Sequence, residues 1–292
     1  MIGKAVSHLG IFFMRLLAWV PLPLLRALGW LLGLVLYALV RSRRRVVERN
    51  LMLCFAELSQ SERAVLVRQV FIYFAQAWLD RSWLWHAPRE MVSQRLHLGG
   101  AVSELQGHDP VVIFAPHFMG MDAGGIALML NLQRHYTSIY TAQSNKVVDA
   151  WMLAGRQRFG VMRMFGRVDG VRDIASALKN GQPLYLLPDM DFGSKGAVFA
   201  PFFGVDAATV PSLSRFARLG GAKVVPVITR LTTRGYDVEV VPAWQNFPTK
   251  DPQVDTVRMN AELEGYIRSM PAQYYWVHKR FKTRPDVGPS LY

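Results

Sequence analysis

Apolar residues dominate the first forty positions of the chain, where they form two runs. The runs cover residues 9–20 and 22–40, and Pro21 and Pro23 mark the break between them. The second run approaches the length of about 20 residues that a transmembrane helix needs. Arg26 lies near its start, from where a long side chain can extend to the bilayer interface. We therefore expect a membrane-binding helix that crosses the bilayer or lies in its interface; a buried N-terminal hairpin of a soluble fold is the alternative.

The pattern changes twice further along the chain. Residues 46–86 follow helical spacing, and Ser59 and Glu62 have the spacing of a capping box at a helix start. After residue 110, short apolar runs alternate with helical segments. We expect strands at 111–114, 137–141, 184–187, 224–229 and 236–241, and helices from about 122, at 171–180 and at 213–219. This alternation predicts an α/β fold, a mostly parallel central sheet flanked by helices, with an antiparallel pair near the C-terminal end.

Charge is unevenly distributed along the 292 residues, which carry 34 Lys and Arg against 21 Asp and Glu. No acidic residue precedes Glu48, whereas seven basic residues do, four of them within 41–45. A basic cluster directly after an apolar run favours anionic membrane lipid over nucleic acid as a partner. By the positive-inside rule it also keeps the rest of the chain cytoplasmic. We divide the chain into a membrane anchor with its basic cluster, residues 1–45, and an α/β domain, residues 46–292.

Candidate chemistry is concentrated at an HX4D motif, His117 and Asp122, after the first predicted strand. Acyl transfer to an alcohol needs a base for the hydroxyl proton, and a histidine ordinarily titrates near pH 6.5. A carboxylate on the other ring nitrogen would fix the tautomer. Five residues along a helix do not share a face, so we expect His117 in the turn and Asp122 in the first helical turn. The spacing alone also fits an ordinary turn histidine beside a capping aspartate.

Longer segments resemble a known family. Residues 187–193, 198–204 and 207–209, the segment 43–51 and above all the ending 273–285 are similar to the late acyltransferases of lipid A biosynthesis, the lauroyl and myristoyl transferases within the glycerolipid acyltransferase superfamily. The resemblance covers nearly the whole chain. It implies transfer of a lauroyl or myristoyl chain from acyl carrier protein to a hydroxyl of a lipid A precursor, at the cytoplasmic face of a bacterial inner membrane.

The resemblance also implies roles for individual residues. His117 would be the general base and Asp122 its carboxylate partner. Arg156 matches the family's arginine block, which is thought to hold a phosphate or the acceptor, with Arg158 as its alternative. Asp189 matches the aspartate of the family's third block. At position 190 the family usually has Gln or His, so the methionine of this chain puts that polar contact in doubt.

A dense basic cluster lies near the C-terminus and includes Arg280. It is composed of His278, Lys279, Arg280, Lys282 and Arg284. We expect it to bind acceptor phosphates or the acidic face of acyl carrier protein, or else to be a solvated basic tail. We expect no cofactor and no metal, because Asp189 and Asp191 lack a third ligand at a suitable spacing. Two alternatives stay open: acylation of another lipid, such as a lysophospholipid or aminolipid, and a non-catalytic lipid-binding envelope protein.

Overall fold

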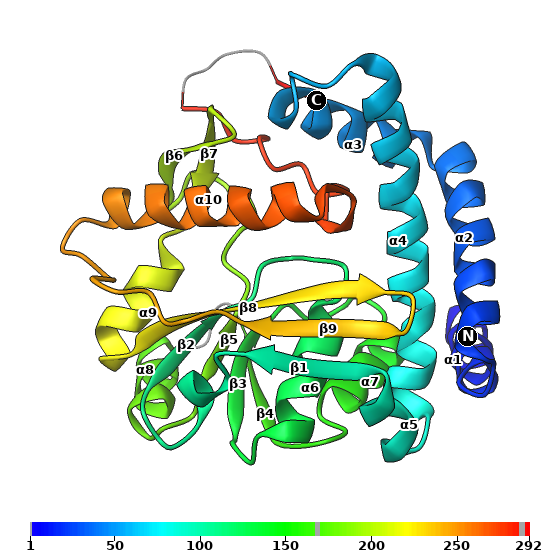
Figure 1. Ribbon diagram of the computed structural model, residues 1–292, viewed down its shortest axis with the longest axis horizontal. Coiled ribbons are helices and arrows are strands. Elements are labelled where there is room, and N and C mark those ends of the chain that lie inside the picture. The colour runs from blue at the N-terminus through cyan, green and yellow to red at the C-terminus, as the bar shows by residue number, and fades with distance from the viewer. Residues whose placement is uncertain (1, 167–169, 286–289) are drawn as a thin grey trace.

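A computed structural model describes residues 2–166, 170–285 and 290–292 (Figure 1). Within these residues the main sheet has seven strands in the order β1-β9-β8-β2-β5-β3-β4. Neighbouring strands are parallel except for β8 and β9, which are antiparallel. The strands are β1 (Leu96–Gly100), β2 (Val111–Phe114), β3 (Tyr136–Tyr140), β4 (Met162–Gly166), β5 (Leu184–Leu186), β8 (Lys223–Thr232) and β9 (Gly235–Val240). The predicted α/β class, the mostly parallel sheet and the antiparallel pair are confirmed.

The central strand β2 has the burial pattern of a strand inside a parallel sheet. All four of its side chains are buried, as expected for a parallel strand covered on both faces. Helices connect and cover the strands, and a separate antiparallel hairpin lies beside α10. These elements are α5 (Arg89–Gln94), α6 (Met121–Asn131), α7 (Lys146–Arg156), α8 (Val171–Lys179), α9 (Ser212–Gly220), α10 (Pro252–Ser269) and the hairpin β6 (Val198–Phe202) and β7 (Val205–Thr209).

One long helix, α4 (Gln60–His86), joins the α/β domain to the N-terminal helices. Its start is the expected capping box: the Ser59 hydroxyl accepts from the Glu62 amide, and the Glu62 carboxylate accepts from the Ser59 amide. One side of α4 packs on the domain, and α2 (Leu22–Leu39) runs along its other side (Figure 1). The contact is close, because a Cβ atom on Gly33 would lie 2.5 Å from Cα of Ile72.

The position of the Arg26 side chain differs from the one that the sequence predicted. Its side chain is bonded to the buried carboxylate of Asp80 on α4 and donates weakly to the carbonyls of Thr232 and Gly235. The expectation that Arg26 extends to the bilayer interface is therefore wrong. A charged side chain in an apolar helix can also be stabilised by a buried ion-pair partner. Because α2 packs on α4, Asp80 supplies that partner for Arg26.

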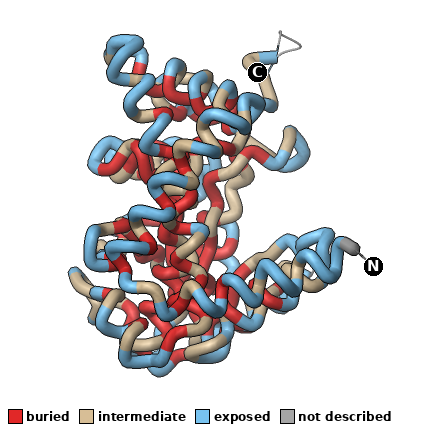
Figure 2. Tube along the Cα trace, turned by 90° about the vertical axis from the view of Figure 1, so that its right-hand side faces the viewer, coloured by how far each residue is buried: buried red, intermediate tan, exposed pale blue. Residues whose placement is uncertain are grey.

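The N-terminal helices leave an apolar face uncovered. Within the described residues, α2 is the helix that is long and apolar enough to cross a membrane. Helix α1 (Ile2–Leu17) precedes it and extends from the body with mostly exposed residues (Figure 2). Helix α3 (Arg41–Cys54) follows and continues through position 45, so the domain boundary drawn there stays a prediction. The expected apolar N-terminal helix is confirmed.

Candidate active site

His117 lies in the turn between β2 and α6, as its position after an apolar strand predicted. The C-terminal segment holds this turn through backbone hydrogen bonds. The His117 carbonyl accepts from the Tyr275 amide at 2.9 Å, and the Met119 amide donates to the Gln273 carbonyl at 2.8 Å. The side chain of Gln273 in turn pairs with both backbone groups of Leu231 on β8. Residues more than 150 positions apart in the sequence therefore fix the orientation of the histidine.

The partner of the His117 imidazole is Asp189, which follows β5. Nδ1 of His117 lies 2.8 Å from Oδ1 of Asp189, and the His117 amide donates to Oδ2 at 3.1 Å. The Tyr274 hydroxyl donates to Oδ2 at 2.8 Å. Asp189 is fully buried, and the His117 side chain is 15% exposed. Burial alone would raise the pKa of Asp189, but the charge and hydrogen bonds of His117, with the Tyr274 hydroxyl, lower it overall.

This geometry determines which ring nitrogen of His117 carries a proton. An ionised Asp189 accepts hydrogen bonds only, so the Nδ1 proton of His117 stays on the side of the carboxylate. Nε2 then carries the lone pair. Because β2 and β5 are neighbouring parallel strands, their carboxyl ends meet at one edge of the sheet, and this places the two residues side by side.

Asp122 has different partners from those expected. It lies in the first turn of α6, as predicted, but Oδ2 accepts from Arg81 at 2.7 and 2.9 Å and Oδ1 accepts from Arg156 at 2.9 Å. Burial raises its pKa, but the two arginines outweigh burial and lower it from 3.8 to about 2. The expectation that the Asp122 carboxylate is hydrogen-bonded to the imidazole is corrected: the Asp189 carboxylate forms that hydrogen bond. The first turn of α6 directs Asp122 toward α4 and α7, where two guanidinium groups hold it.

The two candidate arginines are separated. Arg156, at the end of α7, pairs with Asp122 and lies over the ring of Tyr140. The Arg158 guanidinium instead donates to the carbonyls of Ala87 and Leu84 at the end of α4. Arg156 therefore belongs to the group around Asp122, whereas the hydrogen bonds of Arg158 anchor α4. A binding role for either arginine stays a prediction. Arg81 carried no sequence signal, because it is one polar position in an aromatic-rich helix.

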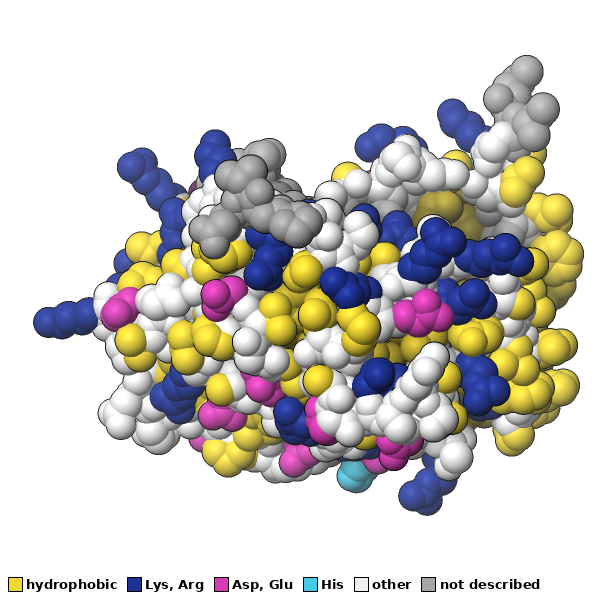
Figure 3. All heavy atoms as spheres, turned by 90° about the horizontal axis from the view of Figure 1, so that it is seen from above, with side chains coloured by type: hydrophobic (Ala, Val, Ile, Leu, Met, Phe, Trp, Pro, Cys, Tyr) yellow, Lys and Arg dark blue, Asp and Glu magenta, His cyan; other side chains and the backbone are white. Residues whose placement is uncertain are grey.

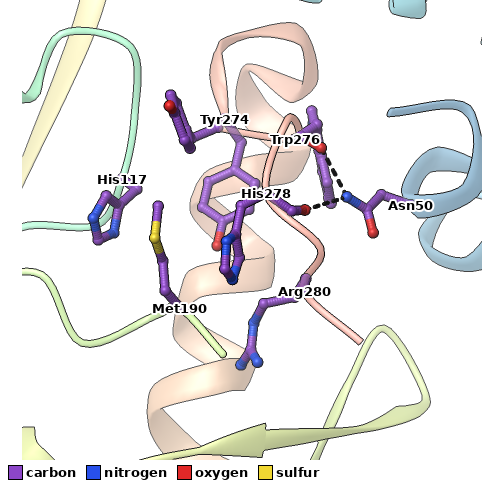
Figure 4. A pocket seen from close by; sticks show the side chains of 8 residues that line it. Asn50, His117, Met190, Tyr274, Trp276, His278 and Arg280 are labelled. Carbon is purple, nitrogen blue, oxygen red and sulfur yellow. Dashed lines mark hydrogen bonds between the residues drawn. The ribbon is translucent and has the colours of Figure 1, made fainter. Parts of the chain in front are cut away.

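A narrow pocket, without room for a water molecule, lies beside the imidazole. Figure 4 shows His117 on one side of it and His278 and Arg280 on the other, with Met190 between them. The lining residues are Asn50, His117, Met190, Tyr274, Tyr275, Trp276, His278 and Arg280. Most of them come from the C-terminal signature, and Asn50 comes from the segment 43–51 that also carried the resemblance. The sequence therefore contained a signal for these positions, but not for their gathering around His117.

The C-terminal basic cluster is divided between the interior and the surface. Arg280 is buried and donates to the Ala208 carbonyl at 2.9 Å and to the Thr209 hydroxyl at 2.7 Å, both on β7. His278 Nε2 accepts from the Asp191 amide at 3.1 Å. Lys279 and Lys282 are exposed. The expectation of one surface cluster is thus corrected, because the chain turns repeatedly between residues 276 and 281. These turns direct Arg280 to β7 and leave Lys279 and Lys282 at the surface.

Protein stability should depend on pH through His278. Burial lowers its pKa from 6.5 to about 4, and the charges of His117, Arg280 and Lys282 act in the same direction. As pH falls below about 6.5, the unfolded chain binds a proton that the folded site excludes, so stability falls until about pH 4. We expect a loss of about 3 kcal/mol across this window. Urea denaturation at several pH values measures it.

The control for this prediction is His278→Gln, whose amide oxygen can still accept from the Asp191 amide. This variant should lose the stability change between about pH 4 and 6.5 that belongs to His278, while the exposed His135→Gln should keep it. An identical pH dependence in wild type and His278→Gln would contradict the assignment.

The chain is similar to known proteins over nearly its whole length. A family model described as bacterial lipid A biosynthesis acyltransferase matches residues 1–283. The chain is 32% identical to a lipid A biosynthesis acyltransferase of Haemophilus influenzae, over 97% of this chain and 89% of the relative. It is 30% identical to the lipid A biosynthesis lauroyltransferase of Escherichia coli K12, over 98% and 94%. It is 31% identical to the myristoyltransferase of the same organism, over 90% and 81%.

Proposed function

This chain belongs to the bacterial lipid A biosynthesis acyltransferases, and on that premise we propose that it moves a lauroyl or myristoyl chain from acyl carrier protein to a hydroxyl of a lipid A precursor. The hydrogen bond between His117 Nδ1 and the buried carboxylate of Asp189, beside a narrow pocket, is the observation that carries the proposal. It supports His117 as the general base.

The chemistry follows from this pair. Nε2 of His117 takes the proton of the acceptor hydroxyl while the oxygen bonds to the carbonyl carbon of the acyl thioester. Asp189 stabilises the imidazolium that forms. The bond between carbon and sulfur then breaks, and the leaving thiolate takes the proton from Nε2. The products are the acylated lipid and the free thiol of the carrier, and no serine or cysteine nucleophile takes part.

The direct experiment is acylation by the purified chain. Purified protein, acyl carrier protein loaded with a lauroyl or myristoyl chain, and a lipid A precursor should give a product heavier by one acyl group in mass spectrometry. A parallel reaction with the acyl coenzyme A tests the donor, and one with a lysophospholipid tests the acceptor. Failure to acylate the lipid A precursor, with turnover of the lysophospholipid, would overturn the proposed acceptor.

The enzyme should act at a membrane surface, because α1, α2 and the turn between them expose many large apolar side chains. The members of this face are Val6, Leu9, Phe12, Phe13, Leu16, Trp19, Leu24, Leu28, Trp30, Leu31, Val35 and Leu39. Figure 3 shows hydrophobic side chains along the right-hand margin, the side on which Figure 1 places α2, with Lys and Arg side chains next to them. We propose the cytoplasmic face of the bacterial inner membrane, with anionic lipid as the contact.

The anchor lies in the plane of this membrane rather than across it. Asn145, before α7, donates to the Ser7 hydroxyl of α1 at 2.8 Å. Beyond the other end of α2, Arg43 donates to the Val277 carbonyl at 3.3 Å. Between them, Arg26 is bonded to Asp80. A spanning α2 would place its two ends on opposite sides of the bilayer, whereas these contacts hold both ends against one domain.

Cysteine labelling should therefore find both ends of the anchor on the cytoplasmic side. We expect Lys4→Cys and Ser42→Cys, both exposed, to resist a membrane-impermeant maleimide in intact spheroplasts and to react after the membrane is opened. The single native cysteine, Cys54, is buried, so its background should be low. Labelling of Lys4→Cys from outside, with Ser42→Cys protected, would mean that α2 crosses the bilayer.

A further inference from the structure

A second cavity lies on the surface between α3 and the C-terminal residues. It has a volume of about 550 Å³. Its lining residues are Ser42, Arg43, Arg45, Val46, Arg49, Lys279, Leu291 and Tyr292, and we name it the cationic groove. Residues 42, 45, 46 and 49 recur at helical spacing, so one face of α3 forms one wall. Lys279 and the residues 291 and 292 form the other.

The two walls are fixed to each other by hydrogen bonds. Nε of Arg49 donates to the Leu291 carbonyl at 2.7 Å. The hydroxyl of Tyr292 is bonded to the Asn50 side chain, and the Phe281 amide donates to it at 3.1 Å. Side chains that are already held lose less conformational entropy when a ligand arrives. The groove is therefore a built site rather than an accidental gap.

The charge of the groove is unbalanced. Among the described residues, four cationic side chains line it, and no aspartate or glutamate does. Within the described part of the chain, none of these four forms an ion pair; Glu48 on the same helix is paired with Arg44 instead. Like charges that face one another across a cavity favour a bound anion, and arginine forks match phosphate oxygens.

The position of the groove connects it to the reaction. Asn50 joins the two cavities: its amide donates at 2.8 Å to the carbonyls of Trp276 and His278, beside His117, and its oxygen is bonded to Tyr292 of the groove. The groove also begins at Ser42, directly after the apolar helix α2. A lipid whose chains lie in the bilayer would thus reach the groove with its headgroup while staying close to His117.

We propose that the cationic groove binds a phosphate group of the acceptor lipid and so positions its headgroup for acylation at His117. The proposal rests on the function proposed above. The groove is concave, and Val46, Leu291 and Tyr292 give it apolar surface beside the charges. This shape suits a phosphorylated sugar headgroup, whereas docking of a carrier protein needs a broad surface of about 800 Å² per partner.

The test uses two side chains that face the groove and make no hydrogen bond with described residues. Arg45 has no such bond, and Lys279 makes its contact with the ring of Tyr292. In the variant Arg45→Gln/Lys279→Gln, the KM for the phosphorylated lipid A precursor should rise about tenfold or more, with kcat within about twofold. The matched control is Lys179→Gln/Lys250→Gln, which removes the same charge from exposed positions elsewhere.

Dephosphorylated precursor identifies the group that is bound. Phosphatase treatment of the acceptor should raise the wild-type KM and abolish the difference between the groove variant and its control. An unchanged acceptor KM in the groove variant would overturn the proposal, as would a rise in the KM for acyl carrier protein instead. If the groove variant binds vesicles of anionic phospholipid more weakly than its control does, while its acceptor KM is unchanged, the groove contacts the bilayer and the proposal is overturned. Absence of turnover in wild type would instead refute the proposed function.

Discussion

Replacing His117 with alanine should lower kcat for acylation of the lipid A precursor by about three orders of magnitude, because general-base catalysis contributes about 10²–10⁴-fold. The acceptor hydroxyl would keep its proton as it attacks the thioester. The other imidazole at this pocket, His278, already uses its Nε2 lone pair to accept from the Asp191 amide. Initial rates of product formation, measured by mass spectrometry at saturating donor and acceptor, give the effect directly. The KM for acceptor should change little, since the imidazole acts on the hydroxyl in the transition state.

The fold should survive this change. Asp189 keeps two donors, the His117 amide and the Tyr274 hydroxyl, so the variant does not leave a buried carboxylate without partners. His135→Ala, an exposed histidine outside the cavity, is the matched control and should retain the wild-type rate. A His117→Ala protein that melts like wild type and turns over at the wild-type rate would refute the base assignment and with it the proposed mechanism.

Replacing Asp189 with asparagine should cost about 10³-fold in kcat, although the two side chains have nearly the same shape. The amide oxygen would take the place of Oδ2, where the His117 amide and the Tyr274 hydroxyl donate. The amide nitrogen would then face Nδ1 and donate to it, so the imidazole proton would move to Nε2. A protonated Nε2 cannot accept the hydroxyl proton. Steady-state kinetics measure the loss.

A spectroscopic measurement separates this positioning role from a general loss of structure. In ¹⁵N spectra of histidine-labelled protein, the proton of the His117 ring should move from Nδ1 in wild type to Nε2 in Asp189→Asn. Asp122→Asn should keep the Nδ1–H form, because Asp122 accepts from Arg81 and Arg156. A tautomer change in Asp122→Asn, and none in Asp189→Asn, would restore Asp122 as the partner of the imidazole.

Local patterns in the sequence determined much of the fold. Burial on both faces makes a parallel strand such as β2 a continuous apolar run, and the capping box at Ser59 and Glu62 is a contact between near neighbours. Such elements depend on residues a few positions apart, and most of their ends were predicted within one or two residues; β8 continues three residues beyond the predicted end at Thr229. The strands β1 and β4 of the main sheet were missed, because a histidine or arginine and glycine interrupt the short apolar pattern of Leu96–Gly100 and Met162–Gly166.

The chemical groups of the site were also predicted, but not their pairing. His117, Asp122, Arg156, Asp189 and Arg280 all came from motifs. Which carboxylate meets the imidazole is decided by the order of strands in the sheet, since β5 lies beside β2 and brings residue 189 to residue 117.

The same reason applies to Arg26, to His278 and to the cationic groove. Each depends on a partner supplied by another element: Asp80 of α4 for Arg26, Asp191 for His278, and Lys279 for the arginines of α3. The sequence by itself determined which residue types and which local elements are present. Only the tertiary structure decided which charges are paired, buried or left facing a cavity, because electrostatic energy depends on distance and burial in space, and separation along the chain does not determine either.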